Sequence, residues 1–258
     1  NPEEGRMVDE QRVALVTGAS AGIGRATATR LGGQGVVVAL NYPDDIELWN
    51  VQEAVAEIEG AGGRAVAVRA DVGDDAAVRA MVEETATKLG RIDYLVNNAG
   101  MTHFVDHVDL EAMTGEKWME IFQVNVVGAF QVTRAAAPHL RATGDGAVVN
   151  VASVSGYTGG GSSIAYAASK AALITMTRSL SRVLGPEIRV NAVAPGFVGT
   201  RWWMESRSDS VELRRGVEER TPLGFAAGPE EMADSIVPLL LHNRFVSGQT
   251  LTVDGGSR

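Results

Sequence analysis

Short apolar runs alternate with longer amphipathic segments along almost the whole chain. The apolar runs are rich in Val, Ile and Ala, and most lack regular polar alternation, which is typical of strands buried on both faces of a sheet. The segments between them have the character of helices, as at residues 45–60, 74–89 and 113–140. We expect the strands at residues 12–17, 35–41, 64–70, 92–98, 146–153, 188–195 and 250–254.

Strand–helix alternation of this kind predicts an α/β fold, with a single Rossmann-type, doubly wound parallel sheet of about seven strands and helices on both faces. No break in composition marks a second domain, so we expect one domain over residues 1–258, with a flexible start at residues 1–10. Residues 196–228 interrupt the alternation. They are charged, contain Trp202 and Trp203, and are bounded by "PG" and "GP". We expect this insertion to cover a substrate site.

Composition excludes several classes of function. The formal net charge is −9 and no basic stripe is present, which argues against a nucleic-acid partner. The chain has no cysteine, so disulfides, thiol catalysis and thiolate metal sites are excluded. No apolar run approaches the ~20 residues of a membrane span. The first residues are acidic and polar, unlike a secretory signal, so we expect a cytoplasmic protein with no membrane partner.

A glycine-rich turn follows the first predicted strand. The sequence "TGASAGIG" places glycines at Gly18, Gly22 and Gly24, and helical periodicity continues after them. A strand that runs through glycines into a helix presents backbone N–H groups that diphosphate can approach, since no Cβ blocks the way. The spacing differs from the usual G-x-G-x-x-G pattern. The alternative is a tight turn that needs glycine for its own conformation.

Tyr166 and Lys170 lie four residues apart, so on a helix they would share a face. A free phenol has a pKa near ~10. A neighbouring cation favours the phenolate and lowers that pKa, which would make Tyr166 a general acid/base for an alcohol or carbonyl. The alternative is a surface tyrosine that stacks on the lysine stem, because this spacing also recurs by chance.

Three further polar features end predicted strands or interrupt an apolar helix. Ser153 follows one strand, the amides of "LVNNAG" at 95–100 follow another, and Asn125 lies within an apolar helix. Each has a structural alternative, as a turn cap or as a core amide with a partner. The carboxyl ends of parallel strands meet at one edge of a sheet, where such folds bind ligands, so together these groups indicate a site.

These motifs resemble those of the short-chain dehydrogenases/reductases, and especially the 3-oxoacyl-carrier-protein reductases and glucose dehydrogenases. The resemblance runs in order along almost the whole chain. It rests on "TGASAGIG" (17–24), "DVGD" (71–74), "NNAG" (97–100), Asn125, Ser153, "YAASK" (166–170), "NAVAPGFVGT" (191–200) and "GQTLTVDGG" (248–256).

The resemblance implies catalytic roles for four residues. Tyr166 would be the acid/base, and Lys170 would lower its pKa and hold the nicotinamide ribose. Ser153 would hydrogen-bond the substrate oxygen, and Asn125 would anchor a water in a proton relay to Lys170.

The resemblance also implies a set of cofactor-binding residues, in which Tyr166 and Lys170 take part. The glycine-rich turn would line the pyrophosphate, the end of the second strand would meet the adenosine ribose, and further groups would flank adenine, ribose and nicotinamide. These residues are Gly18, Ser20, Gly22, Ile23, Gly24, Tyr42, Asp71, Val72, Asn98, Pro195, Gly196 and Thr200.

The function that follows is hydride transfer between NAD(P)(H) and a small-molecule secondary alcohol or ketone, within a single dinucleotide-binding catalytic domain. One alternative is a non-catalytic dinucleotide sensor or scaffold, which would be expected to lose the Ser–Tyr–Lys set. Another is an epimerase or dehydratase of the longer, extended relatives, which resemble T-G-x-x-G-x-x-G. The family also implies a homotetramer, or sometimes a dimer, that pairs through residues 113–140, 164–184 and 250–254.

The choice of cofactor depends on charges near the second strand. Tyr42 stands about where NAD-specific relatives carry Asp, and Ala21 stands where NADP-using relatives often carry Arg or Lys. Asp44 and Asp45 follow the strand and would repel a 2′-phosphate, while Arg25 is the one nearby cation. The dipeptide "NY" is common among NADP-using relatives. Between NAD(H) and NADP(H), the sequence favours NAD(H).

Two other features have no assigned chemistry. His103 and His107 are four residues apart, but no third ligand stands at a suitable spacing, so we expect no metal. Trp202, Trp203 and Met204 either contact substrate or form a packed lid or subunit contact. The run "VELRRGVEER" is most simply a solvated helix face.

Overall fold

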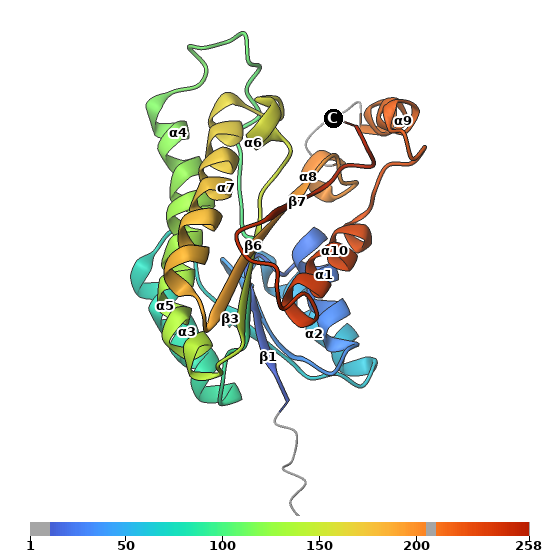
Figure 1. Ribbon diagram of the computed structural model, residues 1–258. Helices are drawn as coiled ribbons and strands as arrows, with labels where there is room; N and C mark the ends of the chain where they lie inside the picture. The colour runs from blue at the N-terminus through green and yellow to red at the C-terminus, as the bar shows by residue number, and fades with distance from the viewer. Residues whose placement is uncertain (1–10, 205–209, 258) are drawn as a thin grey trace, which may run out of the picture.

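The computed structural model describes residues 11–204 and 210–257, and over these ranges it forms one parallel sheet of seven strands in the order β3-β2-β1-β4-β5-β6-β7 (Figure 1). The predicted α/β fold is therefore confirmed. The expected flexible start at residues 1–10 lies outside the described residues. The strands are β1 Val13–Val16, β2 Val37–Tyr42, β3 Ala65–Arg69, β4 Tyr94–Asn97, β5 Gly146–Val151, β6 Ile188–Pro195 and β7 Thr250–Val253.

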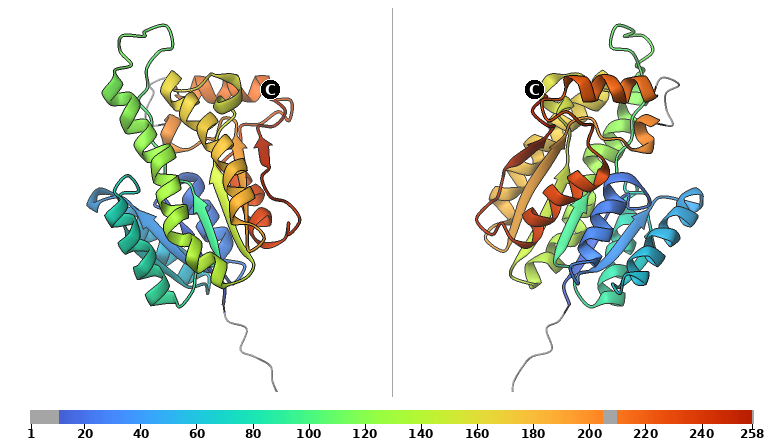
Figure 2. Two further views of the ribbon diagram at one scale, coloured as in Figure 1. Left: turned by 60° about the vertical axis from the view of Figure 1, so that its left-hand side comes forward. Right: turned by 90° about the vertical axis from the view of Figure 1, so that its right-hand side faces the viewer.

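Helices cover both faces of the sheet. One layer holds α1, α2 and α10, and the other holds α3, α4, α5 and α7 (Figure 1). Short helices α6, α8 and α9 lie near the carboxyl end of the sheet (Figure 2). The bounds are α1 Gly22–Gly32, η1 Asp45–Glu47, α2 Leu48–Gly60, α3 Asp75–Leu89, α4 Gly115–Phe122, η2 Gln123–Gly128, α5 Ala129–Ala142, α6 Ser155–Thr158, α7 Ile164–Leu184, α8 Arg201–Met204, α9 Ser210–Arg220 and α10 Pro229–Leu241.

Both faces of the sheet are buried, which explains the absence of polar alternation in the strands. Ala14 and Val16 of β1 belong to a core shared with α1, α2 and α10. Leu15, between them, belongs to a second core shared with α3 and α5. Successive side chains of a strand point to opposite faces, so a strand between two helical layers is apolar at every position.

The helix expected at 113–140 begins at Gly115 and contains a π-helical segment, η2, between α4 and α5. Asn125 lies in that segment. A π-helical turn is rare and often occurs at functional sites, because it redirects side chains within an otherwise regular helix. The irregularity turns Asn125 towards the end of β4, as its hydrogen bonds below show.

The strand order reverses between β1 and β4, so the connections from these two strands leave in opposite directions. Such a switch point opens a crevice beyond the carboxyl ends of the strands. Figure 2 shows that the β4–α4 connection, α8 and α9 gather at this end. The insertion expected at 196–228 therefore contributes α8 and α9 near the crevice, with residues 205–209 outside the described part of the chain.

Candidate active site

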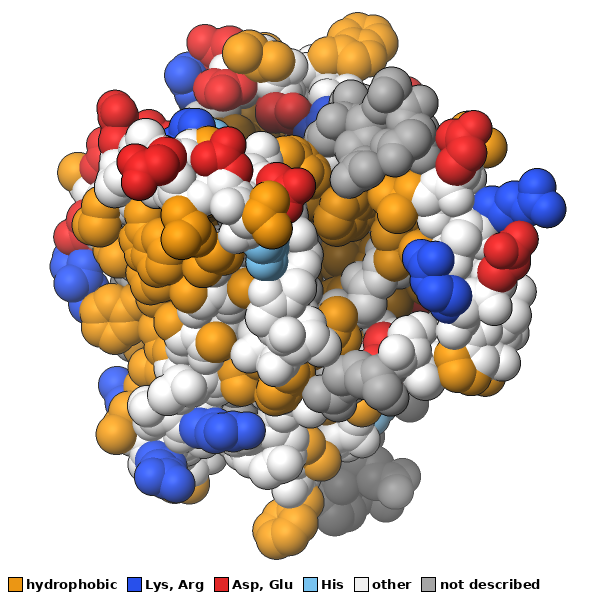
Figure 3. All heavy atoms as spheres, turned by 90° about the horizontal axis from the view of Figure 1, so that it is seen from above, with side chains coloured by type: hydrophobic (Ala, Val, Ile, Leu, Met, Phe, Trp, Pro, Cys, Tyr) orange, Lys and Arg blue, Asp and Glu red, His pale blue; other side chains and the backbone are white. Residues whose placement is uncertain are grey.

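A cavity of about 770 Å³ opens at the carboxyl ends of the strands. Viewed from this end, the molecule is hollowed between apolar side chains (Figure 3). The cavity brings together most of the residues predicted from the sequence, namely Gly18, Ser20, Gly22, Ile23, Asp71, Val72, Asn98, Ser153, Tyr166, Lys170, Pro195, Gly196 and Thr200. Gly24, Tyr42 and Asn125 are not among its lining residues.

The glycine-rich turn has the backbone that its sequence predicts. Gly18 and Gly22 have φ values of +59° and +55°, which L side chains rarely adopt. Gly24 has a different role, because a Cβ there would lie 2.5 Å from Asn98 Nδ2 and closer still to the Gly18 carbonyl oxygen. Gly24 thus permits close packing beneath the turn. The turn leads into the N-terminus of α1, where Ala21 supplies no side-chain cap, so this end of the cavity fits a diphosphate.

Asn98 fixes the turn to the end of β4. Its Nδ2 donates to the carbonyl oxygens of Thr17, at 3.0 Å, and Gly18, at 2.9 Å. Thr17 Oγ1 in return accepts from the backbone N–H groups of Asn98 and Ala99, each at 3.0 Å. This exchange holds the glycine-rich turn rigidly against the neighbouring strand, and the predicted adenosine-side residue acts here as a brace.

The polar cluster of Ser153, Tyr166 and Lys170 lies where α7 meets the end of β5. Ser163 caps α7 by accepting from the Tyr166 backbone N–H at 3.2 Å. The Tyr166 phenol hydrogen-bonds the Ser153 side chain. Lys170 Nζ donates to the Val151 carbonyl oxygen at 2.8 Å and lies 5.6 Å from the centre of the Tyr166 ring. The helix thus places both side chains at one point, as their spacing predicts.

Burial controls the protonation of both groups. It raises the pKa of Tyr166 to about 12, against a smaller lowering by the hydrogen bond with Ser153. It also lowers the pKa of Lys170 to about 8. Lys170 is expected to favour the phenolate, but burial has the larger effect in this arrangement, so the net pKa of Tyr166 is raised; the role expected for Lys170 stays a prediction. The loss of water around the phenol outweighs the nearby ammonium, whose hydrogen bond goes to Val151.

Asn125 is fully engaged within the protein. Its Oδ1 accepts from the Met101 backbone N–H at 2.8 Å, and its Nδ2 donates to the Met101 carbonyl oxygen and to Ser169 Oγ, each at 3.0 Å. Ser169 in turn donates to the Tyr166 carbonyl oxygen at 2.7 Å. Asn125 therefore connects the loop after β4 to α7. Its partner on α7, Ser169, directly precedes Lys170 in the sequence.

The adenosine end differs from the expectation. Asn41 and Pro43 line the cavity, and Tyr42, between them, does not. Asp44 caps η1, and Asp45 pairs with Arg69 at 3.0 Å.

Arg25 points away from the cavity, since it pairs with Glu53 and Glu57 on α2 at 2.8 Å each. Two further charged residues line the cavity, Glu47 and Arg201, and neither was identified from the sequence. No local sequence pattern identifies this pair, because the two residues are 154 positions apart in the sequence. Asn41 was not identified either, although a buried amide at the end of β2 was a usable signal.

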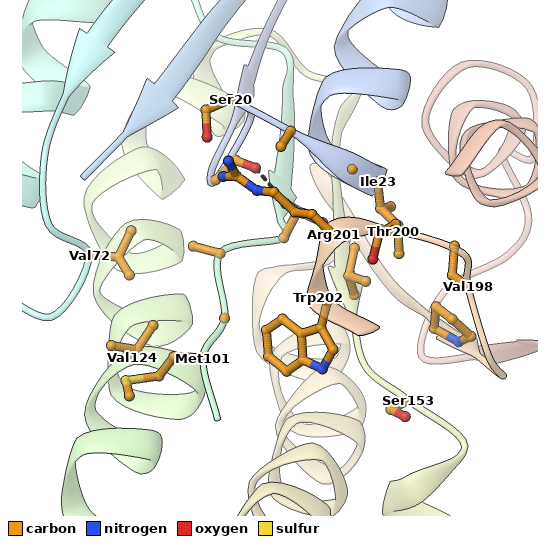
Figure 4. A pocket seen from close by; sticks show the side chains of 18 of the residues that line it. Ser20, Ile23, Val72, Met101, Val124, Ser153, Val198, Thr200, Arg201 and Trp202 are labelled. Atoms are coloured by element: carbon orange, nitrogen blue, oxygen red, sulfur yellow. Dashed lines mark hydrogen bonds between the residues drawn. The ribbon is translucent and has the colours of Figure 1, made fainter. Parts of the chain in front are cut away.

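Two tryptophans of α8 close the other side of the cavity, and both line it. The Trp202 ring lies 5.6 Å from the Tyr166 ring at an interplanar angle of 50°, and Figure 4 shows it pointing from α8 into the cavity. Trp203 contacts Phe104 and Phe197, with ring centres at 5.6 Å and 5.9 Å. Trp202 and Trp203 both line the pocket, a position that suits a contact with substrate and a packed lid alike.

His103 Nε2 and Glu120 Oε2 form a hydrogen bond at 2.7 Å in which the carboxylate accepts. In the described ranges no group of three or more His, Cys, Asp or Glu side chains is arranged to hold a metal ion. Nor is any helix of residues 11–204 and 210–257 long and apolar enough to cross a bilayer.

Comparison with known proteins gives a consistent result. Residues 18–258 match a family described as enoyl-(acyl carrier protein) reductase. The chain is 42% identical to "Granaticin polyketide synthase putative ketoacyl reductase 2" of Streptomyces violaceoruber over 96% of each chain. It is 38% identical to the 3-oxoacyl-[acyl-carrier-protein] reductase FabG of Thermotoga maritima, over 96% of this chain and 98% of the relative.

Solved structures agree with the sequence comparison. A putative short-chain dehydrogenase/reductase from Burkholderia xenovorans is similar with a TM-score of 0.89 and 38% identity, over 96% of this chain and 98% of that one. A 3-oxoacyl-[acyl-carrier protein] reductase with bound NAD from Brucella melitensis has a TM-score of 0.83 and 34% identity, over 96% and 91% of the two chains.

Proposed function

The chain belongs to the short-chain dehydrogenase/reductase family, and from that premise we propose that it reduces the keto group of a 3-oxoacyl or polyketide-like substrate to a secondary alcohol. It is an NAD(P)(H)-dependent oxidoreductase that acts on C=O and CH–OH groups, as its relatives named ketoacyl and 3-oxoacyl reductases indicate. The observation that carries the proposal is the Tyr166 phenol, hydrogen-bonded to Ser153 and backed by Lys170 in the cavity.

The protonation of the two side chains is compatible with reduction of a carbonyl. A phenol with a pKa of about 12 is protonated at neutral pH, so Tyr166 begins as a proton donor and suits reduction of a carbonyl. Ser153 would hold the carbonyl oxygen beside that proton. Lys170, with a pKa of about 8, is mostly cationic at neutral pH and would stabilise the phenolate that remains after transfer. Asn125 would hold the Met101 loop against α7 through its hydrogen bonds to Met101 and Ser169.

The residues of the cavity fit a nicotinamide dinucleotide. The glycine-rich turn suits its diphosphate. Pro195, Gly196 and Thr200 also line the cavity and would contact the nicotinamide. When bound, the cofactor supplies or accepts the hydride. NAD(H) is the preferred form in this proposal, because Arg25, the cation that the sequence offered for a 2′-phosphate, pairs with Glu53 and Glu57 on α2. The Brucella relative with bound NAD supports the same choice.

The assembly and the domain organisation complete the proposal. The chain would act as a single catalytic domain in which residues 196–228 cover the substrate. It would form a homotetramer, which apolar side chains exposed on α4 and α5 support, including Met119 and Phe130. The cytoplasmic location expected from the sequence stays a prediction.

The test is turnover of a panel of 3-oxoacyl thioesters, simple ketones and secondary alcohols with both cofactors, followed by cofactor absorbance. Reduction of a 3-oxoacyl thioester with NADH supports the proposal. If only simple ketones are reduced, the proposed 3-oxoacyl substrate class is wrong, and the proposed carbonyl reduction stands. Tight cofactor binding with no turnover of any compound would favour the non-catalytic alternative, which neither the fold nor the comparisons support.

A further inference from the structure

Two oppositely charged side chains meet at the glycine-rich end of the cavity. Arg201 Nη2 donates to Glu47 Oε1 at 2.6 Å, across 154 positions in the sequence. Glu47 ends η1 after β2, and Arg201 begins α8 after β6. Both line the cavity. Figure 4 shows the Arg201 side chain reaching from α8 towards Ser20, while the Trp202 ring leaves α8 in a different direction.

Glu47 is held as an anion. Arg201 contacts one carboxylate oxygen, and Asn50 Nδ2 donates to the other at 3.1 Å. Partial burial is the largest single influence and opposes ionisation, but hydrogen bonds from Arg201, Ser20 and Asn50 outweigh it and lower the pKa of Glu47. The side chains of Glu47 and Arg201 are 19% and 39% exposed, so cofactor can reach both.

Of the charged side chains that line the described part of the cavity, Arg201 is the cation that a phosphate can reach. Among the described lining residues the charged side chains are Glu47, Asp71, Lys170 and Arg201. Lys170 is occupied at the Tyr166 end, where it donates to Val151. A dinucleotide brings a doubly charged diphosphate to the glycine-rich end, and a guanidinium is well suited to bind it in two-pronged fashion.

We propose that Arg201 is the phosphate-binding cation of the cofactor site, and that Glu47 holds it in the free protein until the cofactor phosphate replaces the carboxylate. This proposal depends on the proposed function in one respect, which is that the ligand is a dinucleotide with phosphate groups. Because Arg201, Trp202 and Trp203 share α8, the exchange links cofactor binding to the helix that faces Tyr166.

The two partners should have opposite effects on cofactor binding. Arg201→Met removes the cation, and we expect it to raise the Kd for NADH roughly tenfold, the usual scale for a charged hydrogen bond. Glu47→Gln removes the competing carboxylate and should lower that Kd a few-fold. The Kd of the Arg201→Met variant should also depend less on salt. The measurement is titration with NADH and NADPH, read by cofactor and tryptophan fluorescence, without substrate.

The matched control is the neighbouring pair Asp45–Arg69, which has the same chemistry at 3.0 Å and lies outside the cavity. Asp45→Asn and Arg69→Met should leave both Kd values unchanged. Equal weakening by Arg201→Met and Glu47→Gln would show that their pair is a structural brace and overturn the proposal. An unchanged Kd in both variants would overturn it as well.

Comparison of NADH with NADPH shows whether Arg201 binds the diphosphate or the 2′-phosphate. Equal loss of NADH and NADPH binding in Arg201→Met assigns the arginine to the diphosphate. Loss confined to NADPH assigns it to the 2′-phosphate, still as a phosphate-binding cation. If the native chain binds neither cofactor, this inference and the proposed function both fail. If it binds cofactor but reduces no ketone, only the proposed function fails.

Discussion

The Lys170 ammonium lies over the ring face of Tyr166, 5.6 Å from its centre, while its hydrogen bond goes to the Val151 carbonyl oxygen. The pair is a partly buried tyrosine whose pKa is raised to about 12 and a buried lysine whose pKa is lowered to about 8. At neutral pH both carry their protons. The site of the free protein is thus arranged to donate a proton and then to tolerate the negative charge that is left.

Tyr166→Phe should abolish turnover and leave cofactor binding nearly intact. The substitution removes only the hydroxyl, and general acid–base help is typically worth ~10²–10⁴-fold in rate. The measurement is kcat together with the Kd for NADH. A variant that keeps most of its kcat would remove Tyr166 from the chemistry.

Ser153→Ala should also lower kcat, with little change in the unfolding midpoint. The serine hydroxyl hydrogen-bonds the Tyr166 phenol, and within residues 11–204 and 210–257 it also accepts from the Ser155 backbone N–H at 3.1 Å. Because that bond lowers the Tyr166 pKa, its loss should raise the pKa further. Kinetics and thermal unfolding on the same preparation test both statements. An unchanged kcat would show that Ser153 only supports the turn.

Lys170→Met should weaken both rate and cofactor affinity and change the alkaline side of the pH profile. The folded pKa of Lys170, about 8, lies below its ordinary value of 10.5. The charge is therefore present below pH 8 and is lost as the pH rises through that value, so kcat/KM of the native protein should fall there. The variant has no such group and should lack this decline. An unchanged profile in a still-active variant would contradict the coupling of Lys170 to Tyr166.

Gly24→Ala should disrupt the cofactor turn. The added Cβ would lie 2.5 Å from Asn98 Nδ2, so the brace between the turn and β4 must move, and NADH binding and the unfolding midpoint should both fall. Gly33→Ala, at the C-cap of the same helix, is the control. Gly33 has φ −64°, and its added Cβ would come no closer than 3.6 Å to other atoms, so this change should be neutral or slightly stabilising. Equal effects of the two substitutions would contradict the packing argument.

Local patterns predicted the sheet and the polar cluster well, because both depend on short-range sequence. The strand at 188–195 matches β6 in full, and the four-residue spacing of Tyr166 and Lys170 suffices to place them on one face. Contacts between distant segments were not accessible. Glu47 and Arg201 have no local signature, and Arg25 proved to pair with α2.

The net direction of the Tyr166 pKa could not be predicted from the sequence, for a related reason. Its direction depends on how much water the folded chain removes from the phenol, and burial depends on the packing of α7 against β5 and α8. A sequence gives the identity of the neighbouring cation but not the balance between its charge and desolvation. The π-helical turn at Asn125 was likewise invisible, since the apolar periodicity continues through it.

Phe130→Asp should dissociate the proposed tetramer. Phe130 is 41% exposed on α5, and Met119 is 64% exposed on α4, so a charge at this face would be buried against a second chain. Light scattering should give a multiple of 27.2 kDa for the native protein and a smaller mass for the variant. Ile46→Asp, at an exposed position on η1, is the control and should keep the native mass. A native mass of one chain at micromolar concentration would refute the assembly.

Trp202→Ala should alter substrate binding and leave cofactor binding alone. Trp202 faces the Tyr166 ring, so its loss opens the space beside the phenol. We expect KM for a bulky 3-oxoacyl thioester to change several-fold, on the scale of a lost aromatic contact, and KM for a small ketone to change less. The Kd for NADH should stay at its native value. Trp49→Ala is the control, because Trp49 is 75% exposed on α2 and lies outside the cavity. Unchanged KM values for every ketone, together with a loss of oligomer mass, would instead assign Trp202 to a subunit contact. Unchanged KM values with the native oligomer mass would identify Trp202 as part of a packed lid. If Trp202 contacted the substrate, its removal would change the ratio of KM for the bulky thioester to KM for the small ketone.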